Sequence, residues 1–190
     1  KAILEKNPNI GLDEDTIEKI NNAKAVIVTS YSVKQDILNN VEIDKDKIHV
    51  VYPSIDEEYL KPKESKEKLA LEFDFDKKNR IILFTAKNFK NNGAKEFCDI
   101  ISSLNYKYIQ VIIAGDAKQI NALKFQISKY NFGDKLLFLE DYKDMNLLFS
   151  AADIFLLPTH MKGFSSNVLK AMFFKCAVFV TSNSSSREVV

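Results

Sequence analysis

Residues 153–172 read DIFLLPTHMKGFSSNVLKAM, an apolar run that passes through a turn into a helix-like segment. The run at 153–159 is almost continuously hydrophobic, as is typical of a strand buried on both faces of a sheet. One of the polar residues at 165–167 can cap a helix that continues to Met172. This stretch therefore predicts a buried strand followed by a helix, the repeating unit of a parallel α/β sheet.

The same alternation recurs on both sides of this stretch. Further apolar runs rich in Val, Ile, Leu and Phe lie at 25–30, 47–53, 80–86, 108–115, 135–140 and 177–182. Two of the intervening stretches have helical spacing, with apolar residues at Phe97, Ile100, Ile101 and Leu104, and at Ile120, Leu123, Ile127 and Tyr130. Strand and helix alternate five times from Arg80 onward. We therefore predict an α/β fold, a Rossmann-like doubly wound parallel sheet with helices on both faces.

The first part of the chain differs from the rest. Residues 11–23 and 32–41 read as helices on either side of the strand at 25–30, and the polar segment 51–73 holds two of the four prolines. That segment predicts a connection followed by a short helix. We place a boundary near Pro53–Asp56, which gives units at 1–55 and 56–190. The chain begins at Lys1 and stops inside an unfinished pattern, so we expect a fragment whose second unit is truncated at its C-terminus.

Composition excludes several classes of protein. The chain is 46% apolar and 28% charged, as in a soluble globular domain, and its net charge of +1 gives no global attraction to nucleic acid or to a membrane. Cys98 and Cys176 are expected to be reduced thiols. His49 and His160 are far apart, and no cluster has metal-ligand spacing. There is no P-loop signature, no dinucleotide glycine fingerprint and no recognisable catalytic set, so the catalytic residues stay unknown and no metal is expected.

Ligands of doubly wound sheets bind beyond the carboxyl ends of the strands, so the loops there are the candidate sites. Lys87 follows the run at 80–86 and is close to the turn at Asn92-Gly93. Free N–H groups before a helix, with cations nearby, suit phosphate, although an ordinary lysine-bearing turn fits as well. Gly115 ends the run at 108–115 and would allow close backbone approach to a ligand; simple turn chemistry is the alternative.

The segment His160–Met172 is a further candidate. Gly163 lets the backbone approach a ligand, and the first-turn amides of the following helix, with its dipole, form an anion site. Lys162 precedes the turn and Lys170 lies about one turn inside the helix, where each either adds charge to a phosphate site or points to solvent. Hydroxyl and N–H groups recur at another helix start, 184–186, with Glu188 in its first turn; a simple capped helix is the alternative.

Taken together, these stretches resemble the donor-binding half of GT-B glycosyltransferases of the family 4, or group 1, type. The resemblance runs from about Ala23 to Val190. AKAVIVTSYSVKQDIL resembles the last strand and helix of the acceptor-side domain, and KIHVVYPSID resembles the interdomain linker. ILFTAKNFKNNG resembles the first donor-domain strand with its basic loop, and VIIAGD and LLFLED resemble the next two strand ends. Residues 147–190 are similar in order and spacing to the family's long carboxyl-terminal signature.

The resemblance implies a function. Such enzymes transfer a sugar from a nucleotide-diphospho sugar, here of the UDP or GDP type, to a glycan or lipid-linked acceptor in polysaccharide biosynthesis, usually with retention and without a bound metal or other cofactor. The resemblance implies a cytoplasmic protein. It leaves open whether the missing domain associates peripherally with the cytoplasmic face of the membrane. No nucleic-acid partner is expected. The fragment alone is expected to be inactive, because most of the acceptor-side domain is absent.

The resemblance also assigns roles by position. Lys87 stands where the family usually has a phosphate-binding Arg, and Asn92, before Gly93, where it usually has a Lys. Lys162 and Lys170 occupy the two glutamates of the E-x7-E motif, of which the first lies near the donor sugar and the second holds the ribose hydroxyls. An ammonium cannot accept those hydrogen bonds, so the motif is degenerate. The remaining matches are Gly163, Phe164, Ser165 and Ser166 in the phosphate- and sugar-binding loop and helix start, and Ser184, Ser185 and Glu188 in the final loop.

Two other functions stay open at this stage. The lysines in place of carboxylates fit a non-catalytic module of the same fold that binds a nucleotide-sugar or a partner protein. A plain phosphate- or nucleic-acid-binding domain is the third hypothesis, and the neutral net charge argues against it.

Overall fold

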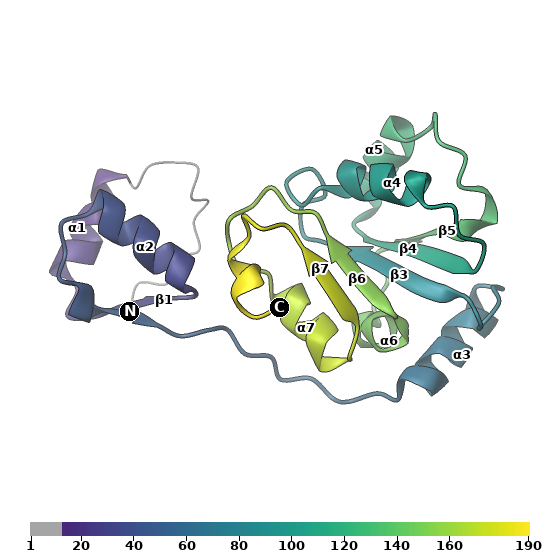
Figure 1. Ribbon diagram of the computed structural model, residues 1–190, viewed down its shortest axis with the longest axis horizontal. Helices are drawn as coiled ribbons and strands as arrows, with labels where there is room; N and C mark the ends of the chain where they lie inside the picture. The colour runs from purple at the N-terminus through teal and green to yellow at the C-terminus, as the bar shows by residue number, and fades with distance from the viewer. Residues whose placement is uncertain (1–12) are drawn as a thin grey trace.

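A computed structural model describes residues 13–190, so the first twelve residues of the predicted unit 1–55 lie outside the description. The chain forms two hydrophobic cores joined by an extended segment (Figure 1). The smaller core is closed by a two-stranded parallel sheet with helices beside it. Its elements are α1 (Glu14–Asn22), β1 (Val26–Val28), α2 (Tyr31–Asn40) and β2 (Ile48–Val50).

The larger unit is built on a five-stranded sheet in which every neighbouring pair is parallel. Its strands are β3 (Arg80–Thr85), β4 (Ile109–Gly115), β5 (Leu136–Glu140), β6 (Ile154–Leu157) and β7 (Ala177–Val180), in the order β5-β4-β3-β6-β7. Every strand lies within a run predicted from hydrophobicity. The predicted doubly wound parallel sheet is thus confirmed.

Helices cover both faces of this sheet (Figure 1). One face carries α4 (Ala94–Ser103) and α5 (Ala117–Gln126); the other carries α3 (Pro62–Glu72), α6 (Met145–Ala151) and α7 (Ser166–Phe173). The helix starts have local causes, since Pro62 is the first residue of α3 and Asp116 and Asp144 accept capping hydrogen bonds at α5 and α6.

Two helices are shorter than their predicted apolar stripes. Only part of the first stripe is buried, because Ile100 and Leu104 are 40% and 43% exposed, and α4 ends at Ser103, so that Leu104 is its C-cap residue. The second stripe runs past its helix, because α5 ends at Gln126 and Tyr130 follows it. Spacing alone cannot show that the buried face of a helix is narrow or where the helix stops.

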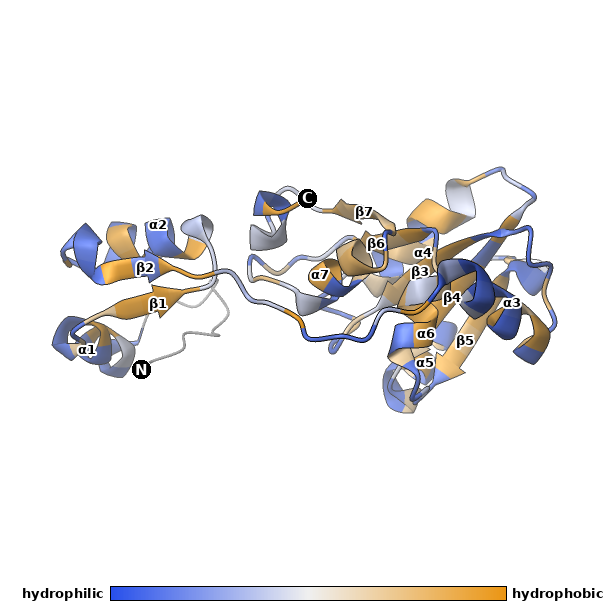
Figure 2. Cartoon of the chain, turned by 90° about the horizontal axis from the view of Figure 1, so that it is seen from below, coloured by the Kyte–Doolittle hydropathy of each residue, from blue (hydrophilic) through white to orange (hydrophobic). Residues whose placement is uncertain are grey.

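Apolar residues concentrate on the strands and on the inward faces of the helices, as Figure 2 shows. No helix within residues 13–190 is long and apolar enough to cross a membrane. Cys98 and Cys176 are free and buried, and burial raises the pKa of each thiol to about 12. Both thiols are therefore protonated at neutral pH.

The edge of the sheet opposite the candidate loops is fixed by Asp153, just before β6. Its carboxylate accepts hydrogen bonds from Lys66 Nζ at 2.6 Å and from Arg80 and the N–H of Ile81, each at 2.8 Å. Burial alone would raise the pKa of Asp153, but these hydrogen bonds outweigh burial and lower it. Asp153 thereby joins α3, β3 and β6.

The strands β3 and β6 are adjacent in the sheet, and the strand order proceeds outward from them in opposite directions, through β4 to β5 on one side and to β7 on the other. The chain leaves β3 toward α4 on one face, and leaves β6 toward α7 on the other (Figure 1). This divergence is the topological switch point, the usual position of a ligand crevice in doubly wound sheets. The loops after β3 and β6 are therefore the first place to look for a site.

Candidate functional site

The N-terminus of α7 presents free hydrogen-bond donors. Ser165 is the N-cap residue, but its side chain makes no capping hydrogen bond, and the N–H of Val168 donates to the Ser165 carbonyl at 3.1 Å. Within the described part of the chain, the amides of Ser166 and Asn167 have no acceptor. Two free N–H groups at the positive end of a helix dipole are an arrangement that can bind an anion.

Buried serines hold the loop that leads into α7. The backbone N–H and the hydroxyl of Ser185 both donate to the carbonyl of Lys162, at 2.8 and 2.6 Å. The Ser184 hydroxyl donates to the Gly163 carbonyl at 3.2 Å, and the N–H of Ser165 donates to Ser186 Oγ at 2.8 Å. The predicted serines of the last loop therefore hold the 162–165 loop in place through these hydrogen bonds.

The loops after β3 and β6 are joined to each other. Thr159 Oγ1 donates to Asn92 Oδ1 at 3.1 Å, and the N–H of His160 donates to the Asn91 carbonyl at 3.0 Å. Gly93 has a φ of +75°, and a Cβ there would stand 1.9 Å from the Pro158 carbonyl oxygen. This glycine thus allows the two loops to touch.

Two further residues complete this packing. Asn167 Nδ2 donates to the Thr85 carbonyl at 3.1 Å, which ties the first turn of α7 to the end of β3. A Cβ at Gly115 would lie 2.6 Å from the ring of Phe89, so Gly115 makes room for that buried ring. The structure places Gly115 in packing at the base of the β3 loop.

Two lysines at this edge keep their charge available. Lys87 follows β3 and is exposed, and Lys162 follows β6 and is half-buried. Within residues 13–190, neither ammonium has an ion-pair or hydrogen-bond partner. Since β3 and β6 are neighbours, these cations and the free amides of α7 all lie at one end of two adjacent strands.

Lys170, by contrast, is neutralised by the linker. Its Nζ lies 2.6 Å from Glu57 Oε1 and 3.1 Å from Asn146 Oδ1, and both charged side chains are only about one-fifth exposed. The hydrogen bond from Lys170 lowers the pKa of Glu57; one from Asn146 adds to this, and burial opposes it. The ammonium of Lys170 is therefore already matched by a carboxylate.

Glu188 and Phe164 face the smaller unit. Glu188 Oε2 accepts from the N–H of Tyr31 and the hydroxyl of Tyr52, and Oε1 accepts from the N–H of Ser32, each at 2.8 Å. The ring of Phe164 lies 6.2 Å from that of Tyr52, between centroids. These predicted site residues therefore lie where the two units meet.

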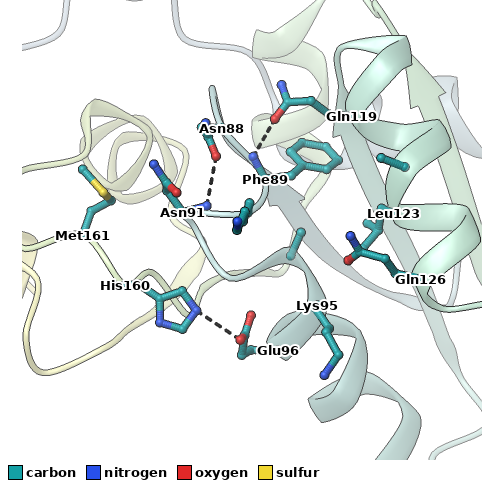
Figure 3. A pocket seen from close by; sticks show the side chains of 13 residues that line it. Asn88, Phe89, Asn91, Lys95, Glu96, Gln119, Leu123, Gln126, His160 and Met161 are labelled. Carbon is teal, nitrogen blue, oxygen red and sulfur yellow. Dashed lines mark hydrogen bonds and ion pairs between the residues drawn. The ribbon is translucent and has the colours of Figure 1, made fainter.

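A hollow of about 690 Å³ lies beside this site, between α4, α5 and the loops after β3 and β6 (Figure 3). It contains none of the predicted site residues. His160 Nε2 lies 3.1 Å from Glu96 Oε1 across its rim. The lining residues are Asn88, Phe89, Lys90, Asn91, Ala94, Lys95, Glu96, Gln119, Ala122, Leu123, Gln126, His160 and Met161.

Some residues of the site gave little or no signal in the sequence. Asn167 and Ser186 stand in segments that the capping pattern singles out, but their partners, Thr85 and Ser165, are not predictable from it. Glu57 gave no signal, because it lies in a polar connection far from Lys170 in the chain. No group of three or more His, Cys, Asp or Glu side chains in the described chain is arranged to hold a metal ion.

The larger unit is a Rossmann-like domain with an uncapped helix start at its switch point, and comparison with known proteins specifies its class. Residues 65–190 match the family described as glycosyl transferases group 1. The match covers more than half of the chain, and the protein belongs to this family.

Relatives agree with this assignment. O-antigen chain mannosyltransferase RfbU of Salmonella typhimurium is 25% identical over 165 residues, which cover 85% of this chain and 43% of that protein. A glycosyltransferase from Rickettsia africae superposes with a TM-score of 0.79 at 21% identity, over 95% of this chain and 51% of its own. Anabaena HepE in complex with UDP-glucose superposes with a TM-score of 0.77 at 17% identity, over 93% of this chain and 50% of the HepE chain. The larger unit thus has the fold of a Rossmann-like domain of GT-B glycosyltransferases, and the chain spans about half the length of these proteins.

Proposed function

We propose that this chain is the donor-binding half of a GT-B glycosyltransferase of the family 4 type, with the end of its acceptor-side domain. Residues 1–55 would end that domain and form the linker, and residues 56–190 would bind a nucleotide-diphospho sugar of the UDP or GDP type. The enzyme would transfer the sugar to a glycan or lipid acceptor with retention and without a metal. The HepE complex with UDP-glucose supports the class of donor.

One observation carries this proposal. The uncapped N-terminus of α7 lies at the switch point together with Lys87 and Lys162, neither of which has a partner in the described chain. A nucleoside diphosphate leaves with its negative charge increased, and fixed amide dipoles and cations stabilise that charge. These groups can therefore perform the task that a metal ion performs at other phosphate sites.

By the resemblance, Lys162 and Lys170 stand at the two positions of the E-x7-E motif, and their contacts in the structure differ. Lys162 is free to contact a phosphate, whereas Lys170 is held by Glu57. The carboxylate of Glu57 therefore lies beside α7, at the position where the helix itself carries Lys170. We propose that Lys162 binds the diphosphate and that Lys170 serves to dock the linker.

Calorimetric titration with UDP, GDP, ADP and their sugar conjugates tests the proposal. We expect one uridine or guanosine nucleotide to bind, and Lys162→Gln to weaken it roughly tenfold, since a hydrogen bond to a charged group contributes about 1.5 kcal/mol or more. Lys107→Gln is the matched control, because this exposed lysine precedes β4 at the opposite edge of the sheet and its loss should leave affinity unchanged. Absence of binding, or equal effects of the two variants, would contradict the proposal.

A non-catalytic binding module is the second candidate, favoured by the lysines that replace both glutamates. The same titration tests the form of this module that has lost donor binding. In that case the native chain binds no nucleotide, and Lys162→Glu combined with Lys170→Glu creates binding. Tight binding by the native chain excludes a module that has lost donor binding.

A further inference from the structure

The carboxylate of Glu188 connects the two units of the chain. It is the last residue of the short 3-10 helix η3 (Ser185–Glu188) in the larger unit, yet both of its oxygens accept hydrogen bonds from elsewhere. The donors are the N–H groups of Tyr31 and Ser32, which begin α2, and the hydroxyl of Tyr52 in the linker. The residues that Glu188 joins are 136 to 157 positions away in the chain.

This carboxylate completes the N-terminal cap of α2. The helix has no acidic residue in its own first turn, and the side chain of its N-cap residue, Ser30, accepts the N–H of Val33. Glu188 supplies acceptors for the two earlier amides, and it brings the negative charge that the helix dipole favours at this end. A helix start in one unit is thus capped from the other unit.

Aromatic rings extend the contact to the candidate site. The Tyr52 ring lies 6.4 Å from that of Tyr31 in an edge-on arrangement and 6.2 Å from that of Phe164. Phe164 belongs to the 162–165 loop that leads into α7. A residue of the linker therefore packs between the start of α2 and the loop of the candidate anion site.

The same short segment shapes the anion site and holds α2. Ser184, Ser185 and Ser186 fix the 162–165 loop by hydrogen bonds, and Glu188 follows them directly. We propose that Glu188 is a positioning residue, an inter-unit latch that sets the orientation of the smaller unit relative to the loop before α7. Motion of that loop and rotation of the smaller unit are coupled through η3. The proposal of a latch depends only on these contacts. Its expected effect on donor binding depends, in addition, on the proposed function.

Amide exchange measured by NMR tests the latch directly. In Glu188→Gln one oxygen becomes an NH₂ group that cannot accept a hydrogen bond, so the exchange of Tyr31 and Ser32 should accelerate at least roughly tenfold. Glu58→Gln is the control, because it makes the same chemical change at an exposed linker residue. Unchanged exchange at both amides, or equal effects of the two variants, would overturn the proposal.

A distance measurement gives a second readout that a purely local cap would not change. Spin labels at Lys24→Cys and Lys107→Cys report the separation of the two units, and the native cysteines are buried. We expect a narrow distance distribution that Glu188→Gln broadens. Tyr52→Phe keeps the ring but removes one hydrogen bond, and should broaden it less. A distribution that is identical in all three chains would overturn the latch.

Binding of UDP distinguishes the latch from the proposed function. If both hold, Glu188→Gln weakens UDP binding without removing it, because the variant loses orientation but keeps Lys162 and the amides of α7. If neither UDP nor GDP binds, the proposed function fails, while the exchange and distance measurements still decide the latch.

Discussion

Replacing Gly93 by alanine is expected to destabilise the larger unit by about 3 kcal/mol or more. The φ of +75° costs an L-residue about 1–2 kcal/mol, and the new Cβ would stand 1.9 Å from the Pro158 carbonyl oxygen. Backbone on both sides must then move apart, as in an overpacked core, at a further cost of roughly 1–3 kcal/mol. Urea unfolding followed by circular dichroism measures the loss.

Gly133→Ala is the matched control for this prediction. Gly133 also has a positive φ, of +54°, but apart from its chain neighbours no atom of the described residues lies within 4 Å of the Cβ position. We expect only the conformational cost of about 1–2 kcal/mol. Equal losses in the two variants would show that the loops after β3 and β6 do not touch as described. Gly93→Ala should also weaken nucleotide binding under conditions where the protein stays folded, since it separates the two loops of the site.

Removal of the Glu57 carboxylate is expected to cost about 2 kcal/mol. Glu57→Gln leaves the ammonium of Lys170 without a counter-charge, at a position only about one-fifth exposed. Breaking a fully buried pair costs about 3–5 kcal/mol, and partial exposure reduces this. The pair lies where the linker packs on the larger unit. Two residues later, the ring centroid of Tyr59 lies 6.1 Å from that of Phe173 and 6.4 Å from that of Phe174. Unfolding in urea again gives the magnitude.

The contribution of Glu57 should depend on pH. Its pKa is lower in the folded chain than the ordinary 4.5, so its stabilisation is complete above that value and is lost as the pH falls through the lowered pKa. The difference in unfolding free energy between the native chain and Glu57→Gln should therefore be constant above about pH 5. It should shrink below about pH 4. A difference that grows with acidity would contradict the pairing.

Two further variants complete this test. The double variant Glu57→Lys with Lys170→Glu reverses the pair and should recover most of the stability lost in either single variant. Asp15→Asn removes one partner of an exposed pair with Lys19, in which the two side chains are 71% and 63% exposed. Because exposed pairs contribute about 0–1 kcal/mol, its effect should be much smaller.

The fold could be predicted from the sequence because it depends on local patterns. Each strand of the sheet is an apolar run, and its parallel pairing follows from alternation with helices. The meeting of the loops that carry Lys87 and Lys162 follows from the same topology, since the strands before them are neighbours at the switch point. The capping residue of α5, Asp116, is likewise a local feature.

The partners of individual charges could not be predicted in this way. Lys170 and Lys162 look alike in the sequence, yet one is paired with Glu57 and the other is free in the described structure. The difference depends on the course of the linker along α7, which is set by tertiary packing. The contact of Glu188 with α2 also spans more than 150 positions, and no periodicity reports it.

We propose that the free amides at the start of α7, with Lys87 and Lys162, hold a nucleoside diphosphate. Amide chemical shifts recorded during titration with UDP locate the bound nucleotide residue by residue. We predict the largest changes at Gly163, Ser166 and Asn167, with GDP as the alternative titrant if UDP does not bind. Largest changes around the hollow between α4 and α5, or no change with either nucleotide, would contradict the claim.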